Sequence, residues 1–417
     1  MLSPGEEGQH CKVSEIEIKV PPIQYPTIRS LVLNFLIELT SKSGGNYSFT
    51  GDTFVLRGDA CATLREALLD VIDVFESRKN IDERGGYCPK LSSNRNDFDW
   101  VGNRIANEMG FQIEKDITIC DFFVKLIKAS AEIVSREPGV VAEELKSIRM
   151  DEGDIYLGRD ESAQYPQLQV FKLEKYKYGK KYLSFTEFKG QMKISSIWYS
   201  ILGAGWLLSF SGYLGSLLLA HIDEDAILSR LMLPGGDPGE LLGALKEYTV
   251  LPLKEGYQPS HTEAYTLLLY LSIDPGKVDR LRNIPAKYSK IVFANTYVVV
   301  EDIGFDISPV YDGVELLIGK EEYAELRERI KEMLRCVLLD YARRPSKYCR
   351  DVWGDTSDLS AMVRYLWNIM SKMDPYTNAY RLIRASPPGK RNFRDPYIAR
   401  KLLKWVDDIM RQGVVLE

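Results

Sequence analysis

The chain has 417 residues, of which 45% are hydrophobic, and its formal net charge is −5. A chain of this length and composition buries more than one hydrophobic core, so two or three domains are expected. Six cysteines, the closest pair of which is 13 positions apart, argue against a disulfide framework and exclude a zinc site built on CxxC, so we expect reduced, buried thiols.

The first 20 residues favour a protein that begins in the cytoplasm. They hold Glu6, Glu7, Glu15 and Glu17 and no apolar run, which predicts that there is no signal peptide. Nine glutamines beside abundant Glu, Lys and Arg are typical of a thermophile.

The N-terminal third predicts strands alternating with helices. A possible strand at 13–20 precedes Pro21, and an apolar run from Leu31 to Leu39 suits a helix that ends at Ser43-Gly44-Gly45. The stretch 47–56 alternates like a strand, and Asp59 is placed to cap the next helix. Further helices are expected at 100–109, 120–135 and 139–148.

Residues 84–99, RGGYCPKLSSNRNDFD, have no periodicity and predict an exposed loop. Its polar side chains Lys90, Asn94, Arg95 and Asn96 are of the types that hydrogen-bond base edges in the major groove. The alternative is an ordinary polar surface loop.

Residues 168–189 predict a basic β-hairpin. Tyr178-Gly179-Lys180 is typical of a turn, and aromatic and β-branched residues flank it. Lysines set among aromatic rings fit a nucleic-acid surface, while the alternative is a solvated sheet edge protected from aggregation. The candidate nucleic-acid-binding residues are Lys172, Lys175, Lys177, Lys180, Lys181 and Lys189.

The next 27 residues, Ile194 to Ala220, contain no Asp, Glu, Lys, Arg or His. A helix of this length would reach about 40 Å, enough to cross a bilayer. Ten Gly and Ser residues lower the hydrophobic gain of insertion, and the chain has no second such segment and a mean hydropathy of −0.20. We expect a buried pair of short core helices, with a single membrane span as the alternative.

Downstream, Asp237-Pro238-Gly239-Glu240 predicts a capped helix start, and strands are expected at 290–300 and 314–318. A helix over 320–342 should bury one face, formed by Tyr323, Leu326, Ile330, Leu334, Val337 and Tyr341.

The C-terminal segment is basic although the chain is acidic. From Arg343 to Arg411 there are 15 Lys and Arg against 7 Asp, a net charge of +8 that favours contact with phosphates or an acidic partner. A non-helical loop, Ser386 to Gly389, lies among the arginines. Asp395 caps a last helix that buries Ile398, Leu402, Trp405, Val406 and Ile409 and leaves Arg400, Lys401, Lys404 and Arg411 more exposed. Seven further candidate phosphate contacts are Arg381, Arg384, Lys390, Arg391, Arg394, Lys401 and Lys404; a solvated face is the alternative.

The search for catalytic motifs favours a binding subunit over an enzyme. The chain has no GxxxxGK[ST], HExxH or GxSxG, and its three histidines offer few general bases. His221 with Asp223 and Asp225 is better explained as a solvated turn than as a metal site. We expect no catalytic residue, metal or cofactor, and the alternative is a hydrolase with a carboxylate or histidine site formed only in space.

The run YLSFTEFKGQMKISSIWYSILGAGWLLSFSGY at 182–213, with KLEKYKYGKK before it, resembles the central tract of the large subunit of the archaeal type I-A CRISPR surveillance complex (Cascade). The resemblance implies a non-enzymatic subunit of an RNA-guided antiviral complex near the 5′ end of the guide RNA. It would inspect the protospacer-adjacent motif beside target double-stranded DNA, contact other subunits and help recruit a helicase-nuclease. For such a subunit, the polar side chains of the 84–99 loop are the candidate readers of the short DNA motif. It also implies that the apolar tract lies in a protein core.

Together these patterns predict an α+β protein of helices, β-hairpins and sheets in several domains, with a largely helical C-terminal region. The expected segments are 1–165, an α+β domain with the exposed polar loop; 166–335, with the basic hairpin and the apolar tract; and 336–417, basic and helical. The protein is expected in the cytoplasm and away from membranes.

Overall fold

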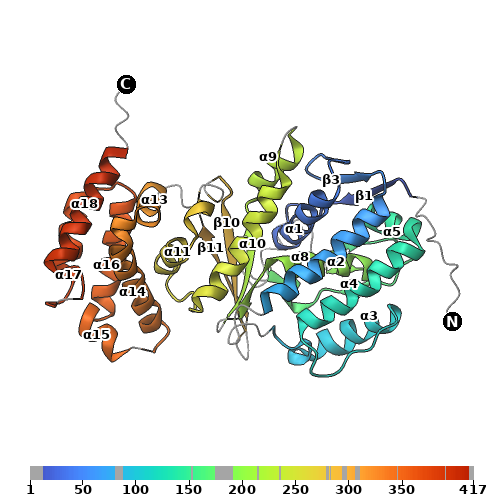
Figure 1. Ribbon diagram of the computed structural model, residues 1–417. Coiled ribbons are helices and arrows are strands. Elements are labelled where there is room, and N and C mark those ends of the chain that lie inside the picture. Colours follow the sequence, from blue (N-terminus) through green and yellow to red (C-terminus); the bar gives the residue numbers. More distant parts are fainter. Residues whose placement is uncertain are drawn as a thin grey trace, which may run out of the picture. The chain divides into compact units, whose positions relative to one another are not determined.

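The computed structural model describes residues 13–79, 88–151, 154–173, 191–213, 216–233, 236–278, 281, 283–293, 298–305, 310–344, 346–389 and 391–412. Contacts group the chain into two compact units (Figure 1). Unit 1 comprises Met1–Tyr213, Leu217–Thr249 and Ile291–Glu301, and unit 2 comprises Leu214–Ser216, Val250–Lys290 and Asp302–Glu417. Both units are discontinuous in sequence. The predicted α+β class and the helical C-terminal region are confirmed.

Unit 1 mixes short strands with long helices. Its strands are β1 (Glu15–Lys19), β2 (Tyr47–Phe49), β3 (Thr53–Arg57), β4 (Ile148–Asp151), β5 (Asp154–Leu157), β6 (Tyr165–Pro166), β7 (Met192–Ile194), β8 (Phe210–Tyr213) and β9 (Leu217–Ile222). Its helices are α1 (Pro26–Lys42), α2 (Ala60–Lys79), α3 (Asn103–Glu108), α4 (Ile119–Arg136), α5 (Pro138–Leu145), α8 (Ser196–Ser209) and α9 (Glu224–Met232). Short helical turns are η1 (Leu91–Ser93), η2 (Asp97–Gly102) and η3 (Gln169–Phe171).

Helix α10 (Pro238–Glu255) and strands β10 (Ala286–Phe293) and β11 (Val298–Phe305) contain residues of both units. The sheets have the strand orders β1-β3-β2, β4-β5-β7-β6 and β11-β10-β9-β8. The first is antiparallel throughout, and alternate residues such as Ile16 and Ile18 are buried, as the period of a strand requires. The stretch 47–56, expected as one strand, is thus a hairpin of β2 and β3.

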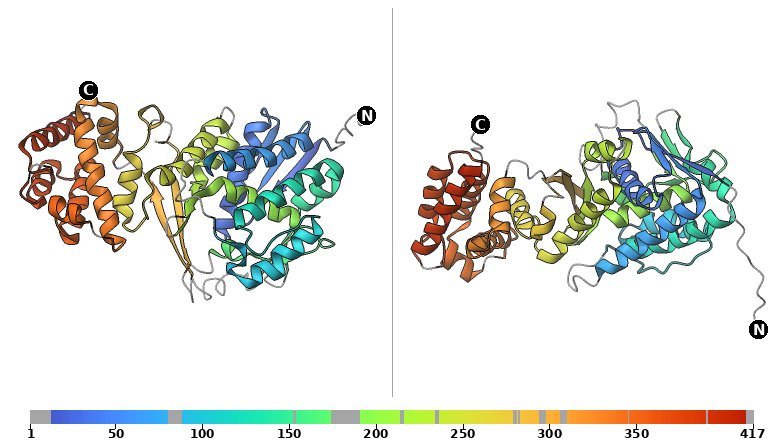
Figure 2. Two further views of the ribbon diagram at one scale, coloured as in Figure 1. Left: turned by 60° about the horizontal axis from the view of Figure 1, so that its bottom comes forward. Right: turned by 45° about the horizontal axis from the view of Figure 1, so that its top comes forward.

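The core of unit 1 is a layer of helices in which α8 packs on α1, α2 and α4 (Figures 1 and 2). Every residue of α8 is buried. The closest approach is at Gly205, where an added Cβ would lie 1.9 Å from the backbone oxygen of Leu31 on α1. Only glycine permits this separation, so the small residues of the apolar tract serve helix packing inside the protein.

The described residues of the apolar tract are buried as predicted, apart from half-buried Tyr213, but its second half forms strands β8 and β9 and not a second helix. Helix α8 ends at Ser209, where buried Arg78 donates hydrogen bonds to the carbonyl oxygens of Leu208 (3.2 Å) and Phe210 (3.0 Å). Gly212 then has a φ of +105°, which a helix cannot continue, and β8 pairs with β9. None of the helices in the described part of the chain is both long enough and apolar enough to cross a bilayer.

Unit 2 is mainly helical, and Figure 2 shows its C-terminal helices gathered together. Its helices are α11 (Thr262–Tyr270), α13 (Tyr311–Gly319), α14 (Ala324–Tyr341), α15 (Lys347–Trp353), α16 (Thr356–Met370), α17 (Pro375–Ala385) and α18 (Pro396–Gln412), with short turns η4 (Pro275–Lys277) and η5 (Glu321–Tyr323). Helix α16 packs on α17 and α14, and α18 packs on α13, α14 and α17. The predicted buried face of α18 is confirmed.

Three local predictions are wrong. Residues 314–318 are helical, in α13, because Val314, Leu317 and Ile318 face the core with helical spacing. Tyr341 is 41% exposed at the end of α14, where its hydroxyl meets that of Ser360 (2.7 Å). The segment 88–99 is not a fully exposed loop, because η1 and η2 form within it.

The expectation of reduced thiols is also wrong. Cys88 pairs with Cys120, and Cys336 with Cys349, each as a disulfide. The Cα atoms are 5.9 and 5.4 Å apart, distances that the bond requires. The pairings depend on tertiary proximity, which spacing along the chain does not reveal.

Candidate nucleic-acid interface

The candidate arginines of the C-terminal segment divide into free and engaged groups. Arg381 and Arg384 lie on the outer surface of α17, and Arg391 follows the Pro-Pro loop; all three are exposed. None of their side chains makes a hydrogen bond or ion pair with the part of the chain that the structure describes. Lys390 lies outside the described residues. These three guanidinium groups are therefore available to an anionic partner.

Arg394 has a structural role instead. Its Nε donates to the carbonyl oxygen of Ile383 (3.3 Å), and its Nη2 donates to that of Arg384 (2.6 Å). These are carbonyl groups at the end of α17 that have no partner within the helix. Arg394 thus stabilises the C-terminus of α17 and fixes the chain that enters α18.

Lys401 and Lys404 point toward the acidic start of α14 and the turn before it. Lys401 Nζ lies 3.6 Å from Glu325, and Lys404 pairs with Glu322. A hydrogen bond with the Glu322 carboxylate raises the pKa of Lys404. The pKa of Lys401 is raised mainly by a hydrogen bond with Tyr397 and, to a smaller extent, by the carboxylate of Glu325. Their charge is balanced locally, so they are weaker candidates for phosphate contact than the free arginines.

Two exposed tyrosines, Tyr376 and Tyr380, accompany the free arginines on α17. The Tyr376 hydroxyl donates to the Asp407 carboxylate of α18 (2.7 Å), which holds its ring in place. These rings are not among the contacts predicted from the sequence, which included the arginines. The signal was present as the spacing Tyr376, Tyr380, Arg384, which places all three on one side of a helix.

The proposed motif-reading loop lies in unit 1. The side chain of Asn94 is hydrogen-bonded within the protein. Its Nδ2 donates to Gln169 Oε1 (3.2 Å), and its Oδ1 accepts from the Asn96 backbone N–H (2.9 Å). Arg95 is highly exposed and pairs with Asp99 one turn later (3.0 Å). The side chain of Asn96 is exposed and makes no hydrogen bond to the described residues, so it is the amide of this loop that remains available.

Lys90 is exposed and forms an isolated bridge with Thr118, which anchors the start of the loop. The π-helical turn η2 anchors its end by burying Asp97, which is 5% exposed and accepts from the Gln169 N–H (2.9 Å). Burial raises the pKa of Asp97 to about 6, although this hydrogen bond and the charge of Lys172 oppose the shift.

Trp100, on the outer side of η2, was missed by the sequence analysis. Its indole ring is 54% exposed, and the guanidinium carbon of Arg104 lies 4.5 Å from the ring centroid. An exposed indole beside Asn96 and Arg95 adds a planar surface to the proposed reading loop. The expected hairpin at 168–189 begins as the turn η3, and Lys175, Lys177, Lys180, Lys181 and Lys189 lie outside the described residues.

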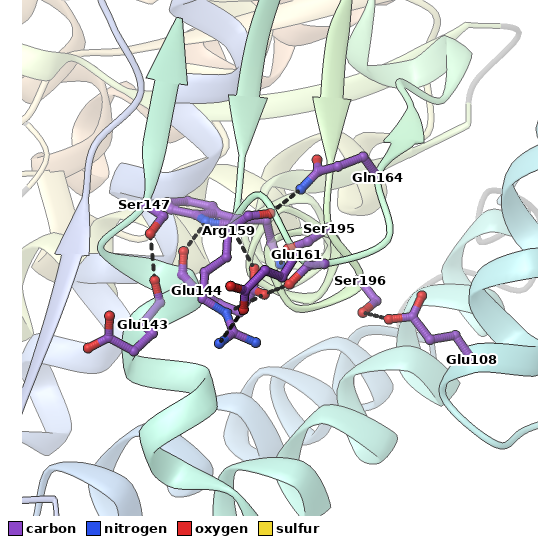
Figure 3. Close-up of polar contacts among 11 residues, drawn as sticks. Glu108, Glu143, Glu144, Ser147, Arg159, Glu161, Gln164, Ser195 and Ser196 are labelled. Atoms are coloured by element: carbon purple, nitrogen blue, oxygen red, sulfur yellow. Dashed lines mark hydrogen bonds and ion pairs between the residues drawn. The ribbon is translucent and has the colours of Figure 1, made fainter.

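Two carboxylates of unit 1, buried Glu144 and exposed Glu108, each accept several hydrogen bonds. Glu144, 2% exposed, accepts from the Arg159 N–H (3.2 Å), from Arg159 Nε (3.3 Å) and from the Ser162 hydroxyl (Figure 3). Glu108 accepts from the hydroxyls of Ser196 (2.8 Å) and Tyr165. Each carboxylate is occupied by donors that join separate elements, so both serve as structural anchors.

The two histidines within the described residues lie in different units. His221 is buried in β9 of unit 1, and His261 begins α11 of unit 2, where its Nδ1 accepts from the Ala264 N–H (3.3 Å). Burial lowers the pKa of His261, which favours this neutral, capping form. Across the described ranges, no group of three or more His, Cys, Asp or Glu side chains is arranged to hold a metal ion.

One hollow of about 660 Å³ lies in unit 1 between the end of α1, strand β2 and the start of α10. Its lining is mainly small or apolar. The carboxylate among its lining residues, Asp237, accepts from the Gly239 N–H (2.8 Å) and so caps α10.

Comparison with known proteins gives no match to this chain among protein-family models, curated proteins or solved structures.

Proposed function

We propose that this chain is the non-catalytic large subunit of an RNA-guided antiviral CRISPR effector complex of the archaeal type I-A kind. In that role it binds guide RNA and target double-stranded DNA in the cytoplasm of a thermophile. The observation that carries the proposal is the set of exposed, unpaired arginines Arg381, Arg384 and Arg391 on a chain whose net charge is −5. A basic surface restricted to one region of an acidic protein is typical of phosphate contact.

The physical demands of an RNA-guided complex agree with these features. Base pairing reads the target sequence, so the protein has only to hold phosphates and to inspect a short motif in the duplex. The free arginines meet the first demand. Asn96 and Arg95 at the start of η2 meet the second, because amide and guanidinium groups reach base edges.

Two further observations agree with the proposed setting. Intracellular proteins of hyperthermophiles often contain disulfide bonds. The Cys88–Cys120 and Cys336–Cys349 bonds agree with such a source. Glu108 and Glu144 are engaged by neighbouring donors, which supports a role in binding rather than in acid-base catalysis. Recruitment of a helicase-nuclease by the assembled complex remains part of the proposal.

Purification of the tagged full-length chain from its native host, followed by sequencing of the RNA that copurifies, tests this function. We expect short guide RNAs that share one end and differ elsewhere, together with the other subunits. RNA that matches the bulk cellular pool, or no RNA, would refute the proposal. The matched variant R381A/R384A, assayed with purified nucleic acid, tests whether the arginines supply the contact.

A further inference from the structure

Helix α17 presents tyrosines and arginines together on its exposed side. Tyr376 and Tyr380 are 44% and 58% exposed, and Arg381 and Arg384 are exposed beside them. Residues four apart follow one another along a helix face, so Tyr376, Tyr380 and Arg384 form a row with about 6 Å of axial rise between neighbours. The opposite side of α17, with Ala379 and Leu382, is buried.

Helix α18 adds two arginines to this surface. Tyr376 at the start of α17 bonds Asp407 near the end of α18, and Arg394 just before α18 bonds carbonyls at the end of α17, so the two helices run antiparallel. Arg400 and Arg411 share the side of α18 that carries Asp407, and both are exposed. We name Tyr376, Tyr380, Arg381, Arg384, Arg400 and Arg411 the α17/α18 face.

The charge of this face is one-sided. It carries four arginines, and Asp407 beside them accepts the hydrogen bond of Tyr376, while Glu322 at the edge of the face is paired with Lys404. The Nε of Arg400 reaches only the Pro396 carbonyl oxygen of its own helix (3.2 Å), which leaves its terminal nitrogens for another acceptor. The face therefore complements a polyanion.

We infer that the α17/α18 face binds single-stranded nucleic acid, with Tyr376 and Tyr380 stacking on unpaired bases and the arginines holding the phosphates. A single strand offers both its charged backbone and the open faces of its bases, whereas the bases of a duplex are stacked on one another and closed to the rings. The Tyr376–Asp407 bond positions one ring in advance. This inference rests on the proposed function, and it specifies that the nucleic acid bound at this face is single-stranded.

Neither an acidic protein nor solvent explains the face as well. An acidic protein would satisfy the arginines but gives no reason for two exposed rings in register with them. Solvation alone explains scattered charges, but it does not explain why exposed tyrosine rings lie beside arginines that have no ion-pair partner. A single strand uses both kinds of side chain.

The test is the affinity of the full-length chain for labelled 20-mers of oligodeoxythymidylate and oligouridylate and for a 20-bp DNA duplex, at equal salt. We expect Y376A/Y380A to weaken binding of both single strands by at least 5-fold per ring and to change duplex binding by less than about 2-fold. Y376F/Y380F retains the rings and should bind single strands within about 2-fold of the unsubstituted protein. Tyr341→Ala removes an exposed ring of α14 and should change nothing. The two single-stranded probes separate a guide RNA from a displaced DNA strand as the source.

The outcomes of the two kinds of variant are distinguishable. If Y376A/Y380A leaves single-strand affinity unchanged, or lowers single-strand and duplex affinity by the same factor, the inference is overturned. If R381A/R384A still lowers the affinity for all three nucleic acids in that case, the proposed function stands without the stacking role of the tyrosines. If R381A/R384A changes no affinity, the arginines bind no phosphate and both proposals fail. A defect in Y376F/Y380F equal to that of Y376A/Y380A would assign the effect to the hydroxyls and overturn the stacking role.

Discussion

Arg29 on α1 and Glu224 at the start of α9 are 195 positions apart in sequence, yet the Nε of Arg29 donates to Glu224 Oε1 at 2.7 Å. Arg29 is 5% exposed and also donates to the carbonyl oxygens of Pro21 and Gly51, both at 2.9 Å. One buried guanidinium therefore joins the first helix to the β2–β3 turn and to α9.

Replacement of Arg29 by Ala should destabilise the protein by about 3 kcal/mol, because two buried carbonyls and a carboxylate lose their donor. Chemical denaturation monitored by circular dichroism measures the change. The control Arg95→Ala removes an exposed guanidinium and should cost less than about 1 kcal/mol. Equal losses in the two variants would contradict the assignment.

Gly205→Ala should destabilise the chain severely, by at least the 1–3 kcal/mol typical of overpacking. The added methyl carbon would lie 1.9 Å from the Leu31 backbone oxygen, and neither helix backbone can move without disturbing the core. The control is Gly139→Ala on α5, where nothing lies within 4 Å of the new Cβ. That substitution should stabilise the helix by about 0.5–1 kcal/mol, as measured by thermal unfolding.

Asp97→Asn should change how stability depends on pH. The folded state raises the pKa of Asp97 from 3.8 to about 6, so between these values it holds a proton that the unfolded chain has lost. Stability due to this group is therefore present below about pH 4 and is lost as the pH rises to 6. The neutral amide avoids that loss and still accepts from the Gln169 N–H.

The difference in unfolding free energy between Asp97→Asn and the unsubstituted chain should be near zero at pH 4 and grow to as much as about 3 kcal/mol above pH 6. Urea denaturation at pH 4, 5, 6 and 7 measures it. A difference that stays constant across this range would show that Asp97 titrates at its ordinary pKa.

The double variant R381A/R384A should weaken binding to unrelated nucleic acid sequences alike. The slope of log affinity against log salt should become shallower by about 0.9 for each lost B-DNA phosphate contact. K401A/K404A is the matched control, because those lysines face Glu325 and Glu322 and should contribute little. Equal effects of the two double variants would show that Lys401 and Lys404 contact nucleic acid as well as the arginines do, despite their ion pairs with glutamates.

Asn96→Ala should reduce discrimination between motif and non-motif duplexes by about 1–3 kcal/mol per bidentate contact and leave nonspecific binding nearly unchanged. Asn94→Ala should instead lower stability, because Asn94 bonds Gln169 and the backbone of the loop. Competition binding in the assembled complex and thermal unfolding separate the two effects. Unchanged discrimination in the Asn96 variant would place motif reading elsewhere.

The sequence by itself determined what depends on neighbouring residues. Helical spacing identified the buried face of α18, with Ile398, Leu402 and Trp405, and side-chain chemistry identified the caps Asp59 and Asp237. The excess of arginine and lysine near the C-terminus was equally visible, since composition needs no coordinates.

Only the tertiary structure decided what depends on contacts between distant residues. It converted the end of the apolar tract into strands, because Phe210 and β9 join a sheet, and it paired the cysteines. It also separated the arginines on the surface of α17 from Arg394, Lys401 and Lys404, whose partners lie on other elements. A charged residue looks the same in sequence whether it is free or paired, because the position of its partner is fixed by packing and not by spacing along the chain.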